Sequence, residues 1–435
     1  MANDRSDVGA PGESRPEADR RRRLAFVYHP ESFSTFALME AARTVCDLSW
    51  VVDTTMAEVG SMQRLLRRFG TVVDVAGMSG AEAAACVAAE RPDGILALAD
   101  SLLEWTAGVA QLLTLPFITP EAAHRLTDKH AQRAALRDGG LPGPGFWRVP
   151  AAEDDDAWAS LARSATFPAV LKPLHGEGSR NVVLVGSLDE VRSVVAEMSA
   201  APGSPRPGMV LEEYLRDRPP GAGERFAGYV SVESIVSAGR VSHLAITGRF
   251  PLAEPFRETG FFIPSALGAD ERDAVLLVAS AAITALGVTI GCLHTEIKLT
   301  PDGPRVIEVN GRVGGGVPDM LAAVTDLDLL AIAMRIAIGE EIIFDELPGC
   351  TQVGYRLLWQ APVSMRRIIA VEGLDQLRAD PRVHQVTLRR GPGQTVNWRE
   401  GNWEHVFSVL GVAADHDDLK VLAQRIHDDT QVRGD

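Results

Sequence analysis

The sequence predicts a multidomain protein in which a parallel α/β domain precedes α+β domains. Two patterns lead to this fold class. As far as residue 118, apolar runs of strand length alternate with helical segments, which is typical of a parallel sheet. Beyond that point, apolar runs come in pairs joined by tight bends, which is typical of antiparallel hairpins. With 435 residues, 46% hydrophobic and 23% charged, the chain can bury several cores, because single cores stop growing at about 250–300 residues.

Composition and charge exclude several classes of partner. The formal net charge is −15, from 43 Lys and Arg against 58 Asp and Glu, so we expect neither a nucleic acid nor an anionic membrane surface as partner. The four cysteines show no CxxC spacing, which predicts neither disulfides nor a zinc site and favours a cytoplasmic location. Residues 1–23 are polar and precede only the short apolar run LAFVY, so they predict a disordered tail and no signal peptide or membrane span.

Residues 24–118 form the predicted parallel α/β domain. Helical segments such as SMQRLLRRF separate its four apolar runs, at residues 24–30, 48–55, 71–77 and 93–100. No GxGxxG follows the first run, so the dinucleotide-binding fingerprint is missing. The loop HPESFST after that run is a candidate ligand contact, because ligands bind beyond the carboxyl ends of parallel strands. A purely structural loop is the alternative.

Residues 119–208 include a helix that carries a lysine in an unfavourable place. Thr127 or Asp128 can cap the helix KHAQRAALRDG, and Gly139 and Gly140 can end it. Lys129 then lies in the first turn, where the helix dipole favours an anion over a cation. A lysine kept at this position indicates an anionic ligand.

The stretch FPAVLKPLHGEGSRNVVLV, residues 167–185, predicts two strands joined by a Gly-rich bend. Lys172 stands at the mouth of the bend, and the chain has only four lysines among its 43 basic residues. The bend supplies permissive backbone, a hydroxyl and an imidazole, from Gly176, Gly178, Ser179 and His175. It can lay its N–H groups over a phosphate; a plain hairpin is the alternative. It is not the GxxxxGK[ST] loop, since the lysine precedes the glycines and no helix follows.

Residues 209–345 begin with MVLEEYL, an apolar run that ends in two carboxylates, an aromatic ring and a leucine. Apolar cover beside a few polar groups suits the edge of an adenine ring. Glu212, Glu213, Tyr214 and Leu215 are therefore candidate nucleotide contacts, and a strand end with solvated acids is the alternative. The alternating run YVSVESIV then predicts an antiparallel strand, paired through SAGR with VSHLAIT.

The hairpin formed by LHTEIKL and RVIEVN carries the densest group of polar residues. A Pro-Asp-Gly turn joins its two strands, and the period of two places His294 and Glu296 on one face. If the strands pair symmetrically about Asp302, Glu296 lies opposite Glu308 and His294 lies opposite Asn310.

Opposed carboxylates at this register need a compensating charge. Directly opposed side chains have Cβ atoms about 5 Å apart, and two ionised carboxylates there repel each other. Oxygen ligands on a rigid strand pair suit Mg²⁺ or Mn²⁺ and not zinc, so Glu296, Glu308 and Asn310 are the predicted metal ligands. A structural pair relieved by Lys298 or Arg312 is the alternative.

Arg312 follows this hairpin and leads into VGGGVPD. Consecutive glycines are typical of backbone that approaches another group closely. A guanidinium beside them can grip a carboxylate or phosphate through two parallel hydrogen bonds.

The order of these motifs resembles the ATP-grasp superfamily over residues 24–345: a lysine, a lysine with a Gly-rich hairpin, EEYL, then E-x-K and E-x-N-x-R-x-G-G-G. The resemblance implies a fold in which two α+β subdomains, residues 119–208 and 209–345, clamp ATP. It implies that Lys129 and Lys172 touch the phosphates, that HGEGS closes over them, and that residues 212–215 hold adenine. Glu296, Glu308 and Asn310 would hold two Mg²⁺ or Mn²⁺ ions. Arg312 would stabilise the charge on the transferring phosphoryl group.

Within the superfamily, YVSVESIV and TGRFPLAEPFRETGFFIPS resemble the L-amino acid ligases. That resemblance implies an amino-acid pocket lined by Arg257, Glu258, Gly260, Arg312, Gly314 and Gly315, with Glu258 facing a substrate ammonium. Two departures are visible. Tyr229 stands near the position of a glutamate that meets ribose, which leaves Glu224 as the substitute. The small side chains of Gly314 to Gly316 leave room for a larger acceptor.

The expected reaction is ATP-dependent amide formation between a small-molecule acid and an amine. Phosphorylating a carboxylate makes an acyl phosphate with a good leaving group, which the amine then attacks, and positioned charges suffice for this chemistry. An ATP-grasp enzyme with a non-amino-acid substrate, such as a carboxylase, is one alternative, and a nucleotide-binding protein without turnover is another. Residues 346–435 predict a small α+β domain that closes the site. A homodimer is compatible with this interpretation.

Overall fold

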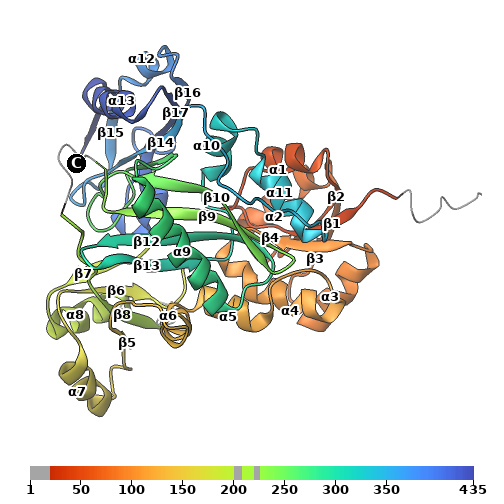
Figure 1. The fold of residues 1–435 in the computed structure, drawn as a ribbon, viewed down its shortest axis with the longest axis horizontal. Helices are drawn as coiled ribbons and strands as arrows, with labels where there is room; N and C mark the ends of the chain where they lie inside the picture. Colours follow the sequence, from red (N-terminus) through yellow and green to blue (C-terminus); the bar gives the residue numbers. More distant parts are fainter. Residues whose placement is uncertain (1–19, 200–207, 220–225) are drawn as a thin grey trace, which may run out of the picture.

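The computed structural model describes residues 20–199, 208–219 and 226–435 (Figure 1). Most of the predicted tail and the ribose candidate Glu224 therefore lie outside the described residues. The strands of the described residues form four sheets. The predicted combination of a parallel α/β domain with α+β parts is confirmed.

The N-terminal sheet has the order β3-β2-β1-β4 and is parallel throughout. Its strands are almost entirely apolar along β1 and β4, as expected when helices cover both faces. The strands are β1 (Arg23–Val27), β2 (Asp47–Val52), β3 (Thr71–Asp74) and β4 (Gly94–Ala97), and the helices between and after them are α1 (Thr35–Ala42), α2 (Ala57–Leu66), α3 (Gly80–Ala89) and α4 (Leu103–Leu113).

A helix from much later in the chain also covers this sheet. Helix α11 (Leu329–Ala337) packs against α1 and β4, and Figure 1 shows it beside α1. A Cβ atom at Gly94 would lie 1.9 Å from the Ala337 carbonyl oxygen, so the close approach requires glycine. The N-terminal domain is therefore tied to the rest of the molecule through a shared core.

A second, antiparallel sheet has the order β5-β8-β6-β7 and carries the Gly-rich bend between β6 and β7. Its last strand in sequence begins at Met209, where the sequence predicted the next subdomain to begin. The elements of this region are α5 (Pro120–Thr127), α6 (Lys129–Asp138), β5 (Phe146–Arg148), α7 (Asp155–Ser164), β6 (Ala169–Pro173), β7 (Val183–Val185), α8 (Leu188–Ser199) and β8 (Met209–Glu213).

The central sheet is antiparallel, with the order β13-β12-β9-β10-β11-β14-β17-β16. It runs across the boundary predicted at residues 345–346, because strands from both sides pair with each other. Its elements are β9 (Tyr229–Ser237), β10 (Arg240–Arg249), β11 (Gly260–Ile263), β12 (Gly291–Thr300), β13 (Gly303–Asn310), β14 (Val353–Gln360), β16 (Val383–Leu388) and β17 (His405–Ala413), with the helices α9 (Ala269–Leu286) and α10 (Val317–Val324).

The C-terminal part adds a two-stranded sheet and a helix over the end of the central sheet, drawn in blue in Figure 1. It comprises β15 (Ile368–Glu372), α12 (Leu374–Arg378), the 3₁₀ segment η3 (Trp398–Glu404), α13 (His416–Asp429) and β18 (Gln431–Gly434). Among the described helices, none has the length and apolar character needed to cross a membrane.

Candidate active site

A cleft of about 1550 Å³ lies where these parts meet. The N-terminal loop at residues 31–34, the Gly-rich bend, the central strands and the segment before β17 all line it. The candidate loop HPESFST therefore contributes to the cleft. The predicted site residues that line it are Lys129, Lys172, His175, Gly176, Gly178, Ser179, Glu212, Glu213, Tyr214, Leu215, Glu258, Glu296, Glu308, Asn310, Arg312 and Gly315.

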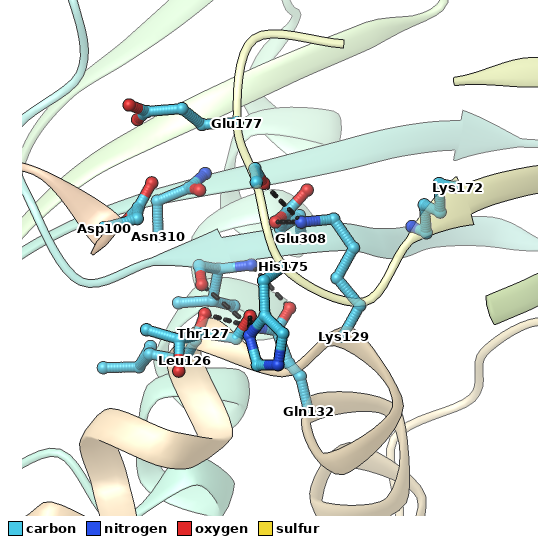
Figure 2. Close-up of polar contacts among 12 residues, drawn as sticks. Asp100, Leu126, Thr127, Lys129, Gln132, Lys172, His175, Glu177, Glu308 and Asn310 are labelled. Carbon is cyan, nitrogen blue, oxygen red and sulfur yellow. Dashed lines mark hydrogen bonds and ion pairs between the residues drawn. The ribbon is translucent and has the colours of Figure 1, made fainter. Parts of the chain in front are cut away.

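Lys129 lies at the start of α6 and reaches across to the central sheet. Its Nζ is 2.7 Å from Glu308 Oε1 and donates a 2.7 Å hydrogen bond to the Gly176 carbonyl oxygen (Figure 2). Burial by itself lowers the pKa of Lys129, but the ion pair with Glu308 outweighs it and leaves the pKa raised. A single ammonium thus connects the predicted metal strand with the predicted phosphate loop.

Lys172 lies at the end of β6 and pairs with Glu212 of β8. The Lys172 Nζ is 2.9 Å from Glu212 Oε2. Arg133 holds the same carboxylate through two bonds, of 3.0 Å from Nε to Oε1 and 2.7 Å from Nη2 to Oε2. Although burial opposes it, the two cations lower the pKa of Glu212 to about 2. The Glu212 side chain is therefore committed to these ion pairs.

Sequence reasoning missed Arg133. Its signal was available, since Arg133 lies four residues after Lys129 and so on the same face of α6. Its Nη1 and Nη2 also donate to the carbonyl oxygens of Val306 and Ile307, both at 2.6 Å. Arg133 therefore joins the sheet that carries the Gly-rich bend to the central sheet, at the wall of the cleft.

The Gly-rich bend is held from the C-terminal part of the chain. Asn402 N donates to the Gly178 carbonyl oxygen at 2.8 Å, and Asn181 N donates to that of Arg399 at 3.0 Å. Gly401 has φ +64°, and a Cβ atom there would lie 2.0 Å from the Gly178 carbonyl oxygen. Segment η3 therefore clamps the bend, a role that the sequence of this segment did not reveal.

Three other predicted site residues, one in the bend and two at the end of β8, have separate contacts. His175 is exposed and its Nδ1 lies 3.2 Å from the Thr127 carbonyl oxygen. Glu213 is exposed, and its Oε2 accepts a 3.2 Å hydrogen bond from Gly145 N. The Tyr214 ring lies 6.4 Å from that of Phe256, and these two rings form an aromatic part of the cleft wall.

Arg312 is paired with two carboxylates from other parts of the chain. Its Nη2 is 2.9 Å from Asp100 Oδ2 and 2.6 Å from Glu177 Oε2 in the Gly-rich bend. Burial raises the pKa of Asp100 to about 6, the Arg312 charge opposes this, and the Glu177 charge adds to it. Sequence reasoning missed Asp100, although it follows β4 at the end of a parallel strand, where ligand sites form.

The two predicted pairings across the β12–β13 hairpin are present, but the predicted symmetry about Asp302 is not: a bulge between Glu296 and Ile297 shifts the register, so that Lys298 pairs with Arg305. Glu296 is the Cα partner of Glu308, and His294 is the partner of Asn310. Lys298 does not relieve the carboxylate pair, since its Nζ lies 2.6 Å from Asp217 Oδ1. Burial opposes the ionisation of Glu296, but His294, Arg249 and Arg312 lower its pKa to about 2, so Arg312 relieves the pair in part.

Each carboxylate of that pair has a cationic side chain beside it. Lys129 neutralises Glu308, and His294 Nε2 lies 3.6 Å from Glu296 Oε1. The described residues contain no group of three or more Asp, Glu, His or Cys side chains placed around one metal position. The predicted set has two carboxylates and one amide, so water and phosphate oxygens would complete the coordination of an ion held there.

Behind the hairpin lies a buried polar network that sequence reasoning did not find. His294 Nδ1 lies 2.9 Å from both Glu233 carboxylate oxygens, and its Nε2 is 3.1 Å from Arg249 Nη2. Burial opposes protonation, but Glu233 raises the pKa of His294 to about 9. Arg249 also pairs with Glu258, whose Oε2 accepts a 3.1 Å hydrogen bond from Asn402 Nδ2.

Three predicted pocket residues do not line the cleft: Arg257, Gly260 and Gly314. Arg257 is buried, and it donates to the carbonyl oxygens of Glu254 and Ala361, with Nε 2.7 Å from the first and Nη1 2.8 Å from the second. A Cβ atom at Gly314 would lie 2.5 Å from His294 Nδ1. The structure therefore gives Arg257 a bracing role, and Gly314 makes space for the buried histidine.

Comparison with known proteins agrees with this geometry. Residues 165–319 match the family model described as ATP-grasp domain. Carnosine synthase 1 from Gallus gallus is 30% identical over 281 residues, which cover 60% of this chain and 29% of that protein. The uncharacterized protein y4rH from Sinorhizobium fredii is 26% identical over 336 residues, 76% of this chain and 66% of that protein. The chain thus spans less than a third of the carnosine synthase and about two thirds of y4rH.

Solved structures share the fold over nearly the whole chain. An L-amino acid ligase from Bacillus licheniformis superposes with a TM-score of 0.75 at 20% identity, covering 96% of this chain and 100% of that one. N5-carboxyaminoimidazole synthase from Aspergillus clavatus gives a TM-score of 0.68 at 14% identity, covering 94% and 98%. The fold and the matched residues together show that this chain contains an ATP-grasp domain.

Proposed function

We propose that the protein is an ATP-dependent ligase that joins the carboxylate of an amino acid or a related acid to an amine. The observation that carries this proposal is the meeting of Lys129, Lys172, Glu296, Glu308, Asn310 and Arg312 in one cleft. These residues come from helix α6, from strand β6 of one sheet, and from β12, β13 and the segment after β13 in the central sheet, and they supply the charges that phosphoryl transfer requires.

The names of two relatives support amide formation over other ATP-dependent reactions. One solved structure with this fold is an L-amino acid ligase, and a sequence relative is a carnosine synthase. The Glu258 carboxylate, in the cleft beside Arg249 and Asn402, offers an acceptor for a substrate ammonium.

Nucleotide binding would rearrange charges that are now paired within the protein. Lys129 and Lys172 lie on either side of the Gly-rich bend, and their ammonium groups can turn from Glu308 and Glu212 toward phosphate oxygens. The oxygen donors of Glu296, Glu308 and Asn310 would hold Mg²⁺ or Mn²⁺, which when bound neutralises phosphate charge. The Tyr214 ring and the apolar side chain of Leu215 would cover the adenine.

In the first chemical step a substrate carboxylate oxygen attacks the γ-phosphorus of ATP. The bond from phosphorus to the bridging oxygen breaks, ADP leaves, and an acyl phosphate forms. In the second step the amine nitrogen attacks the acyl carbon, the bond from that carbon to the phosphate oxygen breaks, and phosphate leaves as the nitrogen loses a proton. Arg312 would stabilise the negative charge that develops in both steps.

The test is phosphate release from ATP and Mg²⁺ with the purified protein, screened over single acids, amines and amino acids and over their pairs. Mass spectrometry of each positive reaction identifies the product. The proposal expects release that depends on a pair and a product lighter than the two substrates by one water. Release with a carboxylated or other product would move the protein to a different ATP-grasp chemistry, and ATP binding without turnover on any pair would overturn the proposal.

A further inference from the structure

One arginine in the cleft has no hydrogen-bond or ion-pair partner within the part of the chain that the structure describes. Arg133, Arg249 and Arg312 each form an ion pair with a carboxylate. Arg356 lines the same cleft from β14, but among the described residues no hydrogen bond or ion pair reaches its guanidinium. The group is therefore available to a ligand.

The sequence around the cleft makes room for this side chain. Arg356 is half-buried on β14, where its Cα partners are Phe261 of β11 and Leu410 of β17. A Cβ atom at Gly316 would lie 2.9 Å from Arg356 Nη1 and 3.1 Å from its Cδ. The last glycine of the GGG run thus lets the arginine lie across the backbone and into the cleft.

The surroundings of Arg356 are electropositive. Burial lowers the pKa of Arg356; Asp319 attracts its charge, whereas Arg389 repels it. The neighbouring His405 has its pKa lowered to about 4, first by burial and then by Arg389, Arg356 and Arg390. Two of these groups, Arg356 and His405, line the cleft directly. An anion placed there would be attracted by the charges of Arg356, Arg389 and Arg390.

We propose that Arg356 binds the carboxylate of the substrate that supplies the amine. This inference rests on the proposed ligase function. When the amine belongs to an amino acid, its own carboxylate is not activated and must be held away from the γ-phosphate. The planar guanidinium matches a carboxylate through two parallel hydrogen bonds, which fixes direction as well as charge. An amino acid or a short peptide with a free carboxylate is therefore the acceptor class.

The acid that becomes phosphorylated uses a different cation. Arg312 lies where Asp100, the Gly-rich bend and the β12–β13 hairpin meet, next to the bend that is predicted to cover the phosphates. Arg356 lies on β14, which is separated from β12 by β9, β10 and β11 in the sheet order. The two arginines thus serve two different anions.

The experiment compares acceptors that differ only in this carboxylate. Proteinogenic amino acids and their carboxamides are supplied as paired acceptors to the wild type, to Arg356→Gln and to Arg433→Gln. Arg433 is a matched control because it lies on the exposed β18 and pairs with Glu372 outside the cleft. Removing a charged hydrogen-bonding partner predicts a KM for the amino acid about thirtyfold higher in Arg356→Gln. The KM for the carboxamide and for ATP should change less than about threefold.

Each result separates the two proposals. If the wild type forms no amide with any pair, the ligase function itself fails. If the wild type is active but Arg356→Gln raises the KM of acid and carboxamide equally, the carboxylate subsite is overturned. Should Arg356→Gln lose its fold, Arg356→Lys keeps the charge without the planar fork. It should retain a preference for the free acid at reduced affinity, and its indifference to the carboxylate would overturn the inference.

Discussion

Lys129 Nζ lies 2.7 Å from Glu308 Oε1, so the first turn of α6 is tied to the second strand of the β12–β13 hairpin. The sequence assigned these two residues to different ligands, one to phosphate and the other to a metal ion. In the structure these two side chains neutralise each other. Ligand binding must therefore replace one buried contact with others of the same kind.

This pair predicts non-additive effects on stability. Lys129→Met and Glu308→Gln each leave an uncompensated group in a buried site, with an expected loss of about 3 kcal/mol in the free energy of unfolding. The double variant should lose clearly less than the sum, because both partners are then gone. Urea denaturation of all four proteins measures the coupling. Additive losses would show that the pair contributes no specific interaction.

The charge on Arg312 predicts an effect on turnover. Arg312→Lys keeps a positive charge but loses the fork that now spans Asp100 and Glu177. If Arg312 stabilises the developing charge, kcat should fall by about 10²–10³-fold while the KM for ATP stays nearly constant. Arg335→Lys, an exposed arginine paired with Glu340, is the control. A rise in KM with an unchanged kcat would assign Arg312 to ground-state binding alone.

The Glu233–His294 pair predicts a pH-dependent stability. The pKa of His294 is about 9 in the folded protein against 6.5 for a free side chain. A raised folded pKa means that the stabilisation is fully present below about pH 6.5 and disappears as the pH rises through about 9. Relative to the wild type, His294→Gln should therefore lose about 3 kcal/mol in the free energy of unfolding at pH 6 and much less at pH 10.

Two measurements check this pH dependence. Urea denaturation of the wild type and His294→Gln at pH 6, 8 and 10 gives the stability difference. The lowered pKa values of Glu233 and Glu296 do not interfere, because those groups stay ionised throughout this range. NMR titration of the imidazole gives its midpoint directly. A midpoint near the free value of 6.5 would contradict the prediction.

The clamp on the Gly-rich bend predicts a large difference between two glycines. Gly401 and Gly393 both have positive φ, of 64° and 86°. A Cβ atom at Gly401 would lie 2.0 Å from the Gly178 carbonyl oxygen, whereas at Gly393 it would meet no atom within 4 Å. Gly393→Ala should lower the free energy of unfolding by about 1 kcal/mol through backbone strain alone. Gly401→Ala should lower it clearly more, because the clash adds to the strain. Equal thermal shifts for the two variants would exclude a close contact at Gly401.

A second readout of the clamp is hydrogen exchange in the bend. Asn402 N and Asn181 N donate the hydrogen bonds that join the bend to η3. Displacing Gly401 should weaken both, so exchange at residues 174–182 should accelerate in Gly401→Ala and not in Gly393→Ala.

Arg257 predicts a loss of stability without a change of specificity. Its buried guanidinium holds the carbonyl oxygens of Glu254 and Ala361. Arg257→Met leaves these acceptors unsatisfied, so we expect the free energy of unfolding to fall by about 2–4 kcal/mol. The exposed Arg272, beside Asp273, gives the control variant Arg272→Met. If Arg257→Met has normal stability but no longer selects between acid substrates, Arg257 contacts the substrate and this prediction is wrong.

Local pattern was sufficient for several features of this protein. The alternation of apolar runs predicted the parallel sheet, and a period of two with the central turn predicted the two pairings at the open end of the β12–β13 hairpin, although not the bulge between Glu296 and Ile297. Both depend on residues close together in the chain, where strand geometry leaves few alternatives. For the same reason the start of α6 was visible at Thr127 or Asp128, and the structure selects Asp128, whose side chain accepts from Ala131 N at 2.8 Å.

What only the tertiary structure decided is which charges meet. Arg133 and Glu212 are 79 residues apart, and Arg312 and Asp100 are 212 apart. Nothing in their local sequence specifies these partners, since each depends on how separate sheets pack. The same holds for η3, which lies more than 200 residues beyond the bend that it clamps.

The sequence by itself determined the kinds of group that gather in the cleft and the strands and bends that present them. The tertiary structure decided that Glu212 serves as an ion-pair partner, that Arg257 braces two carbonyl groups, and that Arg356 remains unpaired among the described residues. The physical reason is that backbone geometry acts over a few residues. The free energy of a buried charge, in contrast, depends on every group that packing brings within a few ångströms.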